Sequence, residues 1–350
     1  MNTIVEWQHF FQSRGVSPKY VDHHIRQVSL LVNSGAPIIF ELEHLSLLMG
    51  IDYPTILSMI NAPRRFYRQF TIPKRSGGER KIDAPYPSLL HCQAWIYRNI
   101  LIKYPVHDSA HGYVPGRSIF TNASVHLNCK TLLKMDLKNF FPSIGIGWVV
   151  NLFSDLGYSK DVAYSLAALC CKDGVLVQGA STSPYLSNIL LNKLDKRLTA
   201  LAKKNGLRFT RYADDLTFSG GYISSNFPKL ICTIVSEYGL AVNDSKTRLL
   251  INKNKKIVTG LSVSGSNLRI TRDLRRNIKK EVFYIERYGL ISHLSQQRIK
   301  DPFYLDSIYG KVNFWLQAEP ANNDALICRE ILAPHFGRNR FAEGSRVSVG

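Results

Sequence analysis

The sequence predicts an α+β fold, because segments with the period of helices are mixed with segments that have the period of strands. Apolar residues recur at helical spacing through residues 1–60 and 183–198. Apolar and polar residues alternate, as they do in strands, through residues 66–84 and 207–219. The 350 residues are enough for a large core and for two or three subdomains.

The chain is strongly basic. Lys and Arg number 45 against 26 Asp and Glu, which gives a net charge of +19. Because 45% of the residues are hydrophobic, the chain folds and the basic excess lies on its surface, where it attracts polyanions such as nucleic acid. No apolar run approaches the roughly 18 residues of a spanning helix, and the N-terminus does not have the pattern of a signal peptide. We therefore expect a cytoplasmic protein with no membrane partner.

The first 85 residues predict helices followed by a hairpin. In residues 40–60, Gly50 separates two short amphipathic runs, which favours two packed helices over a DNA-reading helix-turn-helix. Residues 66–84 alternate on both sides of a Gly-Gly pair and predict a β-hairpin. Lys74 and Arg80 then stand on the two arms near its tip.

The middle of the chain predicts a helix, a loop, a strand and a second helix. Residues 88–104 are helical in pattern, and a loop rich in Gly and Pro follows. The run that ends at Asp136 reads as a strand. Residues 183–198 predict one helix with Ser183 as its cap, Pro184 in its first turn and a leucine at every fourth position.

Two adjacent acids, Asp214 and Asp215, interrupt the second alternating segment. A strand would send the two side chains to opposite faces, whereas a tight turn can aim both at one point. Adjacent carboxylates are tolerated where a divalent cation lies between them. With Asp136 as a third ligand, they could hold two Mg²⁺ ions, which suits nucleotidyl transfer. The alternative to a metal site is an ordinary solvated turn, in which Asp is common.

Residues 271–289 predict a two-faced helix. Thr271 can cap its start, and Gly289 can end it. Leu274, Ile278 and Val282 are spaced to pack inward. Cations recur along another face at Arg272, Arg275, Arg276, Lys279 and Lys280. A solvated basic face is the alternative, but five cations with no acid among them favour contact with the phosphates of a polyanion, either an RNA or a growing hybrid.

Five segments in this order resemble the reverse transcriptases. "IPKRSGGERKI" is similar to the motif in which Lys74 and Arg80 would grip template or incoming nucleotide. "KMDLKNFFPSI" resembles the first palm motif, and its Asp136 would be a metal ligand. The resemblance also implies that Phe141 is the ring that collides with a ribose 2′-hydroxyl and so selects deoxynucleotides.

The remaining segments continue the resemblance. "LVQGASTSPYLSN" would line the nucleotide pocket with Gln178 and Gly179. "RYADD" corresponds to the metal-binding hairpin, and "GLAVNDSKTRLL" would place Lys246 near the leaving phosphates. Two short stretches narrow the resemblance to retron enzymes. They are "NASVH", which contains Asn122 and His126, and "VTG" at residues 258–260. We assign Asn122 and His126 provisionally to RNA binding, although a structural role for His126 is the stronger reading.

The resemblance implies a right-hand polymerase fold with fingers, a ferredoxin-like palm and a helical thumb. The expected regions are an N-terminal helical extension at 1–60, fingers at 61–128, palm at 129–260, RNA-binding thumb at 261–335 and a flexible basic tail at 336–350.

A retron-type enzyme would copy part of its own structured non-coding RNA from dNTPs, with two Mg²⁺ ions or Mn²⁺ in their place. Priming from an RNA 2′-hydroxyl would give branched RNA-linked DNA (msDNA), and a separate effector protein in anti-phage defence is implied. Two alternatives stay open: a diversity-generating or group II intron reverse transcriptase, and a non-catalytic RNA-binding scaffold on a polymerase fold.

Overall fold

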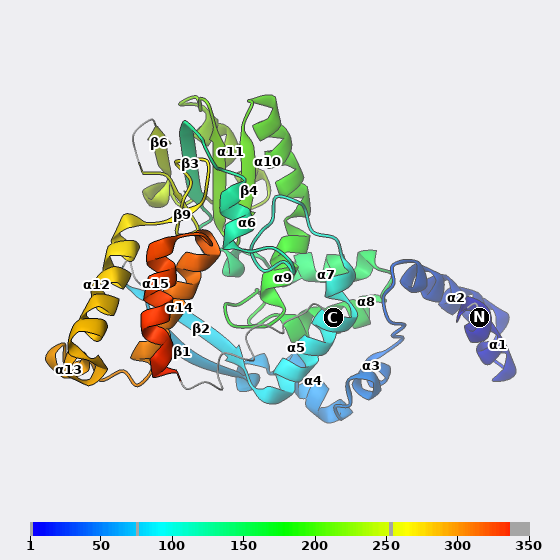
Figure 1. The fold of residues 1–350 in the computed structure, drawn as a ribbon. Coiled ribbons are helices and arrows are strands. Elements are labelled where there is room, and N and C mark those ends of the chain that lie inside the picture. The colour runs from blue at the N-terminus through cyan, green and yellow to red at the C-terminus, as the bar shows by residue number, and fades with distance from the viewer. Residues whose placement is uncertain (1–2, 75–76, 252–254, 337–350) are drawn as a thin grey trace. The chain divides into compact units, whose positions relative to one another are not determined.

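The protein, described here from a computed structural model over residues 3–74, 77–251 and 255–336, divides into two compact units (Figure 1). The first unit contains Met1–Gly116, Lys134–Thr217 and Ser224–Arg248, and the second contains Arg117–Leu133, Phe218–Ile223 and Leu249–Gly350. The expected basic tail, apart from Phe336, lies outside the described residues. Within those residues, no helix combines the length and the apolarity that crossing a membrane requires.

The N-terminal part of the first unit is helical. Gly50 ends one helix with a left-handed φ of 66°, and the Asp52 side chain caps the next by accepting from the Thr55 N–H at 2.9 Å. The two amphipathic runs around Gly50 are therefore separate helices. The helices are α1 (Thr3–Ser13), α2 (Pro18–Asn33), α3 (Leu42–Met49) and α4 (Tyr53–Asn61).

The predicted hairpin is present as β1 (Tyr67–Pro73) and β2 (Glu79–Pro85), which pair antiparallel. Ile72 pairs with Arg80, and the Lys74 N–H donates to the Gly78 carbonyl at 2.9 Å. Lys74 and Arg80 therefore flank one hairpin tip, as the alternation predicted.

The prediction of a single helix over 183–198 is wrong in one respect, because the helix is interrupted at Leu191 and two helices are present. Leu186, Leu194 and Leu198 are nevertheless all buried, so the leucine period continues through two helices that share a core. Ser183 is not the cap, since it lies inside the first turn. The remaining helices of this unit are α5 (Pro87–Asn99), α7 (Ile146–Asp155), α8 (Lys160–Cys170), α9 (Ser183–Leu190), α10 (Asn192–Lys204) and α11 (Phe227–Glu237).

A four-stranded sheet has the strand order β4-β5-β3-β6. The order places a strand from the middle of the chain beside a hairpin that comes about 80 residues later. Asp136 is the last residue of its strand, as predicted. The strands are β3 (Thr131–Asp136), β4 (Arg208–Tyr212), β5 (Asp215–Gly220) and β6 (Arg248–Ile251).

The second unit packs helices around a core that includes Ile278, Val282 and Trp315. Thr271 caps α12 by accepting from the Leu274 N–H at 3.4 Å, and Gly289 ends it, as predicted. In Figure 1, α12 lies beside α14 and α15. The elements of the second unit are α6 (Ile119–Ser124), β7 (Ile257–Val258), β8 (Leu261–Ser262), β9 (Arg269–Ile270), α12 (Arg272–Tyr288), α13 (Leu290–Gln296), α14 (Tyr304–Ala318) and α15 (Asn323–Leu332).

Candidate active site

The acidic pair sits at a two-residue turn between β4 and β5. Tyr212 ends the first strand, Ala213 and Asp214 form the turn, and Asp215 begins the second strand. Ala213 has a φ of 56°, a left-handed conformation that is uncommon for a residue with a side chain. The predicted turn is therefore present, and it takes its shape at some cost in backbone energy.

Gly112 lies against this turn and allows the backbone to approach closely. A Cβ atom at residue 112 would lie 2.7 Å from the Ala213 nitrogen, inside any real contact distance. The Asn188 side chain donates to the Gly112 carbonyl at 2.7 Å, which fixes that backbone from the other side. Any side chain at position 112 would displace the turn.

A fully buried ion pair supports the turn from below. Arg211 makes a two-pronged contact with Asp195, at 2.7 Å from Nε and 2.5 Å from Nη2, and both side chains are inaccessible to solvent. The Arg211 Nη1 donates to the Asn188 Oδ1 at 3.0 Å and to the Ala213 carbonyl at 3.1 Å. Because Ala213 directly precedes Asp214, the guanidinium holds the peptide that carries the catalytic candidate.

Asp136 is joined to the same turn by the backbone. The Leu137 N–H donates to the Asp214 carbonyl at 2.9 Å, and the Asp136 carbonyl accepts from the Asn243 N–H at 2.7 Å. The Lys246 ammonium lies 2.9 Å from each Asp136 carboxylate oxygen. The three acids and Lys246, which come from three separate segments of the sequence, thus belong to one site.

The electrostatics of the site disfavour negative charge on Asp214 and Asp215. Burial, followed by the nearby Asp136 and Asp215 carboxylates, raises the pKa of Asp214 to about 6. Burial likewise raises the pKa of Asp215, partly offset by the Lys134 ammonium. The hydrogen bond to Asp136 raises the pKa of Lys246. Acids that repel one another in a partly buried site favour the arrival of a cation.

The donor set fits a hard divalent cation, because all three acids offer only carboxylate oxygens. In the part of the chain that the structure describes, no three His, Cys, Asp or Glu side chains are arranged closely enough to enclose a metal ion as they stand. Lys246 instead neutralises Asp136 directly.

Gly179 has a clear structural requirement in the second predicted motif. Its φ is +117°, and a Cβ there would lie 2.6 Å from the Asp83 carbonyl oxygen. The Asp83 N–H donates to the Gln178 carbonyl at 2.8 Å, so this loop is bonded to the β1–β2 hairpin through β2. That Gln178 and Gly179 contact a nucleotide stays a prediction.

A buried polar network that the sequence reasoning missed holds the same loop. Asp83 pairs with the buried Lys172 and accepts from the Gln69 amide at 2.6 Å. Gln93 accepts from the Ser181 N–H at 3.0 Å. A lysine and a glutamine within helical or loop patterns gave no signal of burial, because their partners come from distant segments.

Tyr113 is a second residue that the sequence reasoning missed. It has a φ of 62°, and its side chain is 46% exposed. Burial is the main cause that raises the Tyr113 pKa. The charge of Asp214 raises this pKa further, whereas the charge of Arg80 lowers it. The phenol therefore lies within electrostatic reach of both the acidic turn and the hairpin cation. Phe141, in a short 3₁₀ helix (Phe141–Ser143), is 9% exposed and packs on Phe140 with ring centroids 5.1 Å apart.

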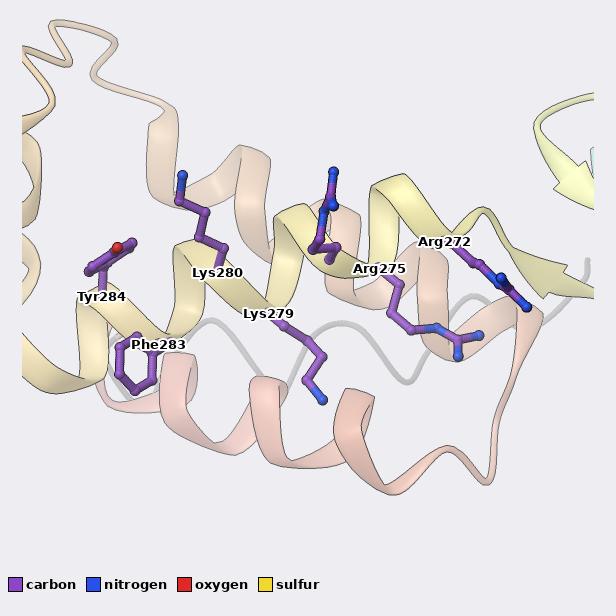
Figure 2. Close-up of a pocket in the computed structure, with 7 residues that line it drawn as sticks. Arg272, Arg275, Lys279, Lys280, Phe283 and Tyr284 are labelled. Carbon is purple, nitrogen blue, oxygen red and sulfur yellow. The ribbon is translucent and has the colours of Figure 1, made fainter.

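Two of the five α12 cations are engaged within the protein, contrary to the prediction that no acid accompanies them. Arg275 pairs with Glu319 at 3.0 Å and stacks over Trp315, and Lys279 pairs with Asp324 at 2.9 Å. Figure 2 shows Lys279 and Lys280 pointing in opposite directions from the helix. The repulsion argument thus fails for Arg275 and Lys279, whose partners lie more than 40 residues further along the chain.

The provisional assignment of Asn122 and His126 to RNA binding is also corrected. Both side chains are buried, at 1% and 0% exposure, so neither is available to a nucleic acid. His126 Nδ1 lies 2.6 Å from the Ser219 hydroxyl, and the Asn122 amide donates to the Thr259 hydroxyl at 3.4 Å. Thr259 and Gly260 form the turn between β7 and β8, with φ of 44° and 87°. The "NASVH" and "VTG" stretches therefore contact each other and serve the packing of the second unit.

Three carboxylates joined to one sheet, together with the mixed helices and strands, define the polymerase class. Residues 72–284 match the family "Reverse transcriptase (RNA-dependent DNA polymerase)". The chain belongs to the reverse transcriptase family, and its relatives assign it to the retron type within that family. The predicted α+β right-hand polymerase fold follows from this membership.

The relatives are bacterial enzymes. The chain is 37% identical over 273 residues to the retron Mx65 reverse transcriptase of Myxococcus xanthus, covering 71% of this chain and 64% of that one. It is 36% identical to the retron Mx162 enzyme of the same organism, of which it spans 52%. It is 32% identical over 259 residues to the retron Ec86 reverse transcriptase of Escherichia coli, covering 73% of this chain and 81% of that one.

Solved structures show more distant likeness. Telomerase from Candida albicans, in complex with a fragment of telomeric RNA, has 12% sequence identity and a TM-score of 0.41, covering 79% of this chain and 64% of that chain. A foamy viral protease-reverse transcriptase has 18% identity and a TM-score of 0.40, covering 80% and 43%.

Proposed function

We propose that the protein is an RNA-directed DNA polymerase of the retron type. The observation that carries this proposal is the junction of Asp136 with the Asp214–Asp215 turn and Lys246. It supports nucleotidyl transfer, because Asp136, Asp214 and Asp215 would hold a hard divalent cation, which would supply Lewis-acid chemistry for phosphoryl transfer. The substrates in this proposal are dNTPs and an RNA template, and the ions are two Mg²⁺.

The protein's own groups have distinct parts in this mechanism. Asp136, Asp214 and Asp215 supply the oxygen ligands, and the buried Arg211 pair keeps their turn in place. Lys246 pairs with Asp136 and would supply an ammonium group to the triphosphate. Lys74 and Arg80 on the hairpin tip would contact the incoming nucleotide or the template, with Gln178 and Gly179 bordering the pocket.

Phe141 is proposed to select the sugar. An aromatic ring beside the nucleotide C2′ position excludes a hydroxyl sterically, and the small exposed part of Phe141 is compatible with contact along a ring edge. The likeness to retron enzymes further supports a dedicated structured RNA as both template and primer, a branched RNA-linked DNA product (msDNA), cytoplasmic action, and a separate effector protein in anti-phage defence.

Loss of a single carboxylate tests the catalytic proposal. Asp214→Asn and Asp136→Asn remove ligand charge while keeping side-chain shape, so each should abolish Mg²⁺-dependent DNA synthesis on a primed RNA template. RNA affinity should change little, because the basic surface is untouched. Incorporation of labelled dNTP and RNA binding are measured on the same preparations.

Asp161→Asn is the matched control, since Asp161 is an exposed acid at the start of α8. Its synthesis rate should equal that of the parent. Robust synthesis by the Asp214 or Asp136 variant would refute the three-carboxylate site.

A further inference from the structure

The cations of α12 that lack an ion-pair partner among the described residues belong to a row that winds around the helix and continues into aromatic side chains. Arg272, Arg276 and Lys280 are spaced four residues apart, and the same spacing leads to Tyr284 and Tyr288. Residues four apart lie on neighbouring turns of a helix, about 6 Å apart along its axis. The five side chains form one slanting ridge, which we call the Arg272–Tyr288 ridge.

The cations of the ridge differ from their neighbours in having no internal partner. Within the described part of the chain, Arg272, Arg276 and Lys280 take part in no ion pair, while Arg275 and Lys279 are bound to Glu319 and Asp324. Figure 2 shows the result for two adjacent residues, with Lys280 directed away from the side to which Lys279 points. Three cations on one ridge are therefore free to bind anions.

The tyrosine end of the ridge borders a pocket. It is lined by Tyr284, Tyr288, Ser292, Ser295 and Gln296. Tyr284 stacks on Tyr288 with ring centroids 6.0 Å apart and an interplanar angle of 24°, and on His293 at 6.0 Å and 11°. The His293 Nε2 lies 2.7 Å from the Tyr304 hydroxyl, which fixes this row of rings. Tyr288 is 57% exposed and offers a ring to a further aromatic partner.

A second pocket lies along the cationic part and shares the lining residue Tyr284 with the first. It is lined by Arg272, Arg275, Arg276, Lys279, Lys280, Phe283 and Tyr284 (Figure 2). The two neighbouring pockets therefore present cations, then aromatic rings, then hydroxyl and amide groups. Phosphates, base faces and base edges are the matching groups of a nucleic-acid strand.

We propose that the Arg272–Tyr288 ridge binds an unpaired segment of RNA, with its phosphates on Arg272, Arg276 and Lys280 and one base in the tyrosine pocket. The assignment to a single strand follows from the pocket, because only an unpaired base can expose its face to Tyr288 and its edge to Ser292, Ser295 and Gln296. The assignment to RNA rests on the proposed function, in which RNA is the partner present before any DNA is made.

The ring of Tyr288 provides the first test. In fluorescence anisotropy with the full chain and a labelled, unstructured 12-nucleotide RNA, Tyr288→Ala should weaken binding about tenfold, the usual worth of one base stack. Tyr288→Phe keeps the ring and should bind as the parent does. Binding of a blunt duplex of the same sequence should be unchanged in both variants.

The free cations provide the second test. Arg276→Gln combined with Lys280→Gln should reduce the salt dependence of single-stranded RNA binding by about 1.4 in log-log slope, or about 0.7 per phosphate contact. Lys279→Gln is the matched control, because the Lys279 ammonium is adjacent to the ridge but already paired with Asp324. Its slope should equal that of the parent.

Three results would overturn the inference. They are unchanged affinity in Tyr288→Ala, an unchanged slope in the double variant, and DNA of the same sequence binding as tightly as RNA. Each preparation is also assayed for extension of a primed template. If any of these three results is obtained while the parent protein extends the primed template, the ridge is overturned and the polymerase proposal stands. A parent that binds RNA as expected but extends nothing would support the ridge and refute the polymerase proposal.

Discussion

At the scale of single residues, the site combines groups whose roles were predictable with groups whose roles depended on tertiary contacts. The meeting of Asp136 with Asp214 and Asp215 was predictable because one acid ends a strand and the other two stand in a strand-turn-strand segment, and their catalytic role stays a proposal. Arg211 was not, since an arginine in an alternating strand has the pattern of an exposed cation. Its partner Asp195 lies 16 residues earlier, and no local period connects the two.

Phe141 offers a prediction at this scale. Phe141→Ala should allow incorporation of ribonucleotides that the parent rejects, because the ring that would meet the 2′-hydroxyl is gone. The measurement is the ratio of kcat/KM for a dNTP and the corresponding rNTP on one primed template.

Phe140→Ala is the control for general damage, since Phe140 packs against Phe141 and is equally buried. It should lower stability without altering the ratio. An unchanged ratio in Phe141→Ala would leave Phe141 as a core residue only.

At the scale of elements, the β4–β5 turn owes its position to charges that lie beneath it. Removing one partner of a buried ion pair leaves the other charge without compensation. Arg211→Met should therefore lower the free energy of unfolding by about 3–5 kcal/mol, and adding Asp195→Leu should restore much of it. Urea denaturation followed by circular dichroism measures both.

The exposed pair of Arg197 with Glu237, at 2.5 Å, is the comparison within the same unit. Arg197→Met should leave the urea midpoint essentially unchanged, because solvent screens exposed charges. If Arg211→Met were equally harmless, the buried pair would not be what supports the turn.

Elements were predictable where a local signal marked both the period and the ends. The β1–β2 hairpin has alternation and a Gly-Gly tip, and α12 has a Thr cap and a Gly end. The break at Leu191 was missed because the leucine period carries across it unchanged. The acids that pair with Arg275 and Lys279 were missed because Glu319 and Asp324 are 44 and 45 residues away in sequence.

At the scale of the whole molecule, the net charge of +19 makes a bound polyanion the expected state in the cell. We predict that the protein, purified at low salt, carries one predominant short RNA joined covalently to DNA. Sequencing of the copurified nucleic acid, with and without ribonuclease and deoxyribonuclease, provides the measurement. The Asp214→Asn variant should carry the RNA without the DNA.

This experiment also separates the remaining classes of reverse transcriptase. A mixture of unrelated RNAs with no attached DNA would contradict the retron assignment and favour an enzyme that copies external primed templates. RNA without DNA in both the parent and the variant would favour the non-catalytic scaffold.

The strand order β4-β5-β3-β6 of the four-stranded sheet also determines when the site can form during synthesis. Asp136 and its partner Lys246 are 110 residues apart, so at about 5–20 residues per second the ribosome adds the lysine roughly 5–20 s after the aspartate. The turn at Ala213 is synthesised within the same interval, after Gly112, which packs against it, has already been added. Competence to bind nucleotide is thus acquired in one late step, and a nascent chain shorter than this carries basic surface without a polymerase site.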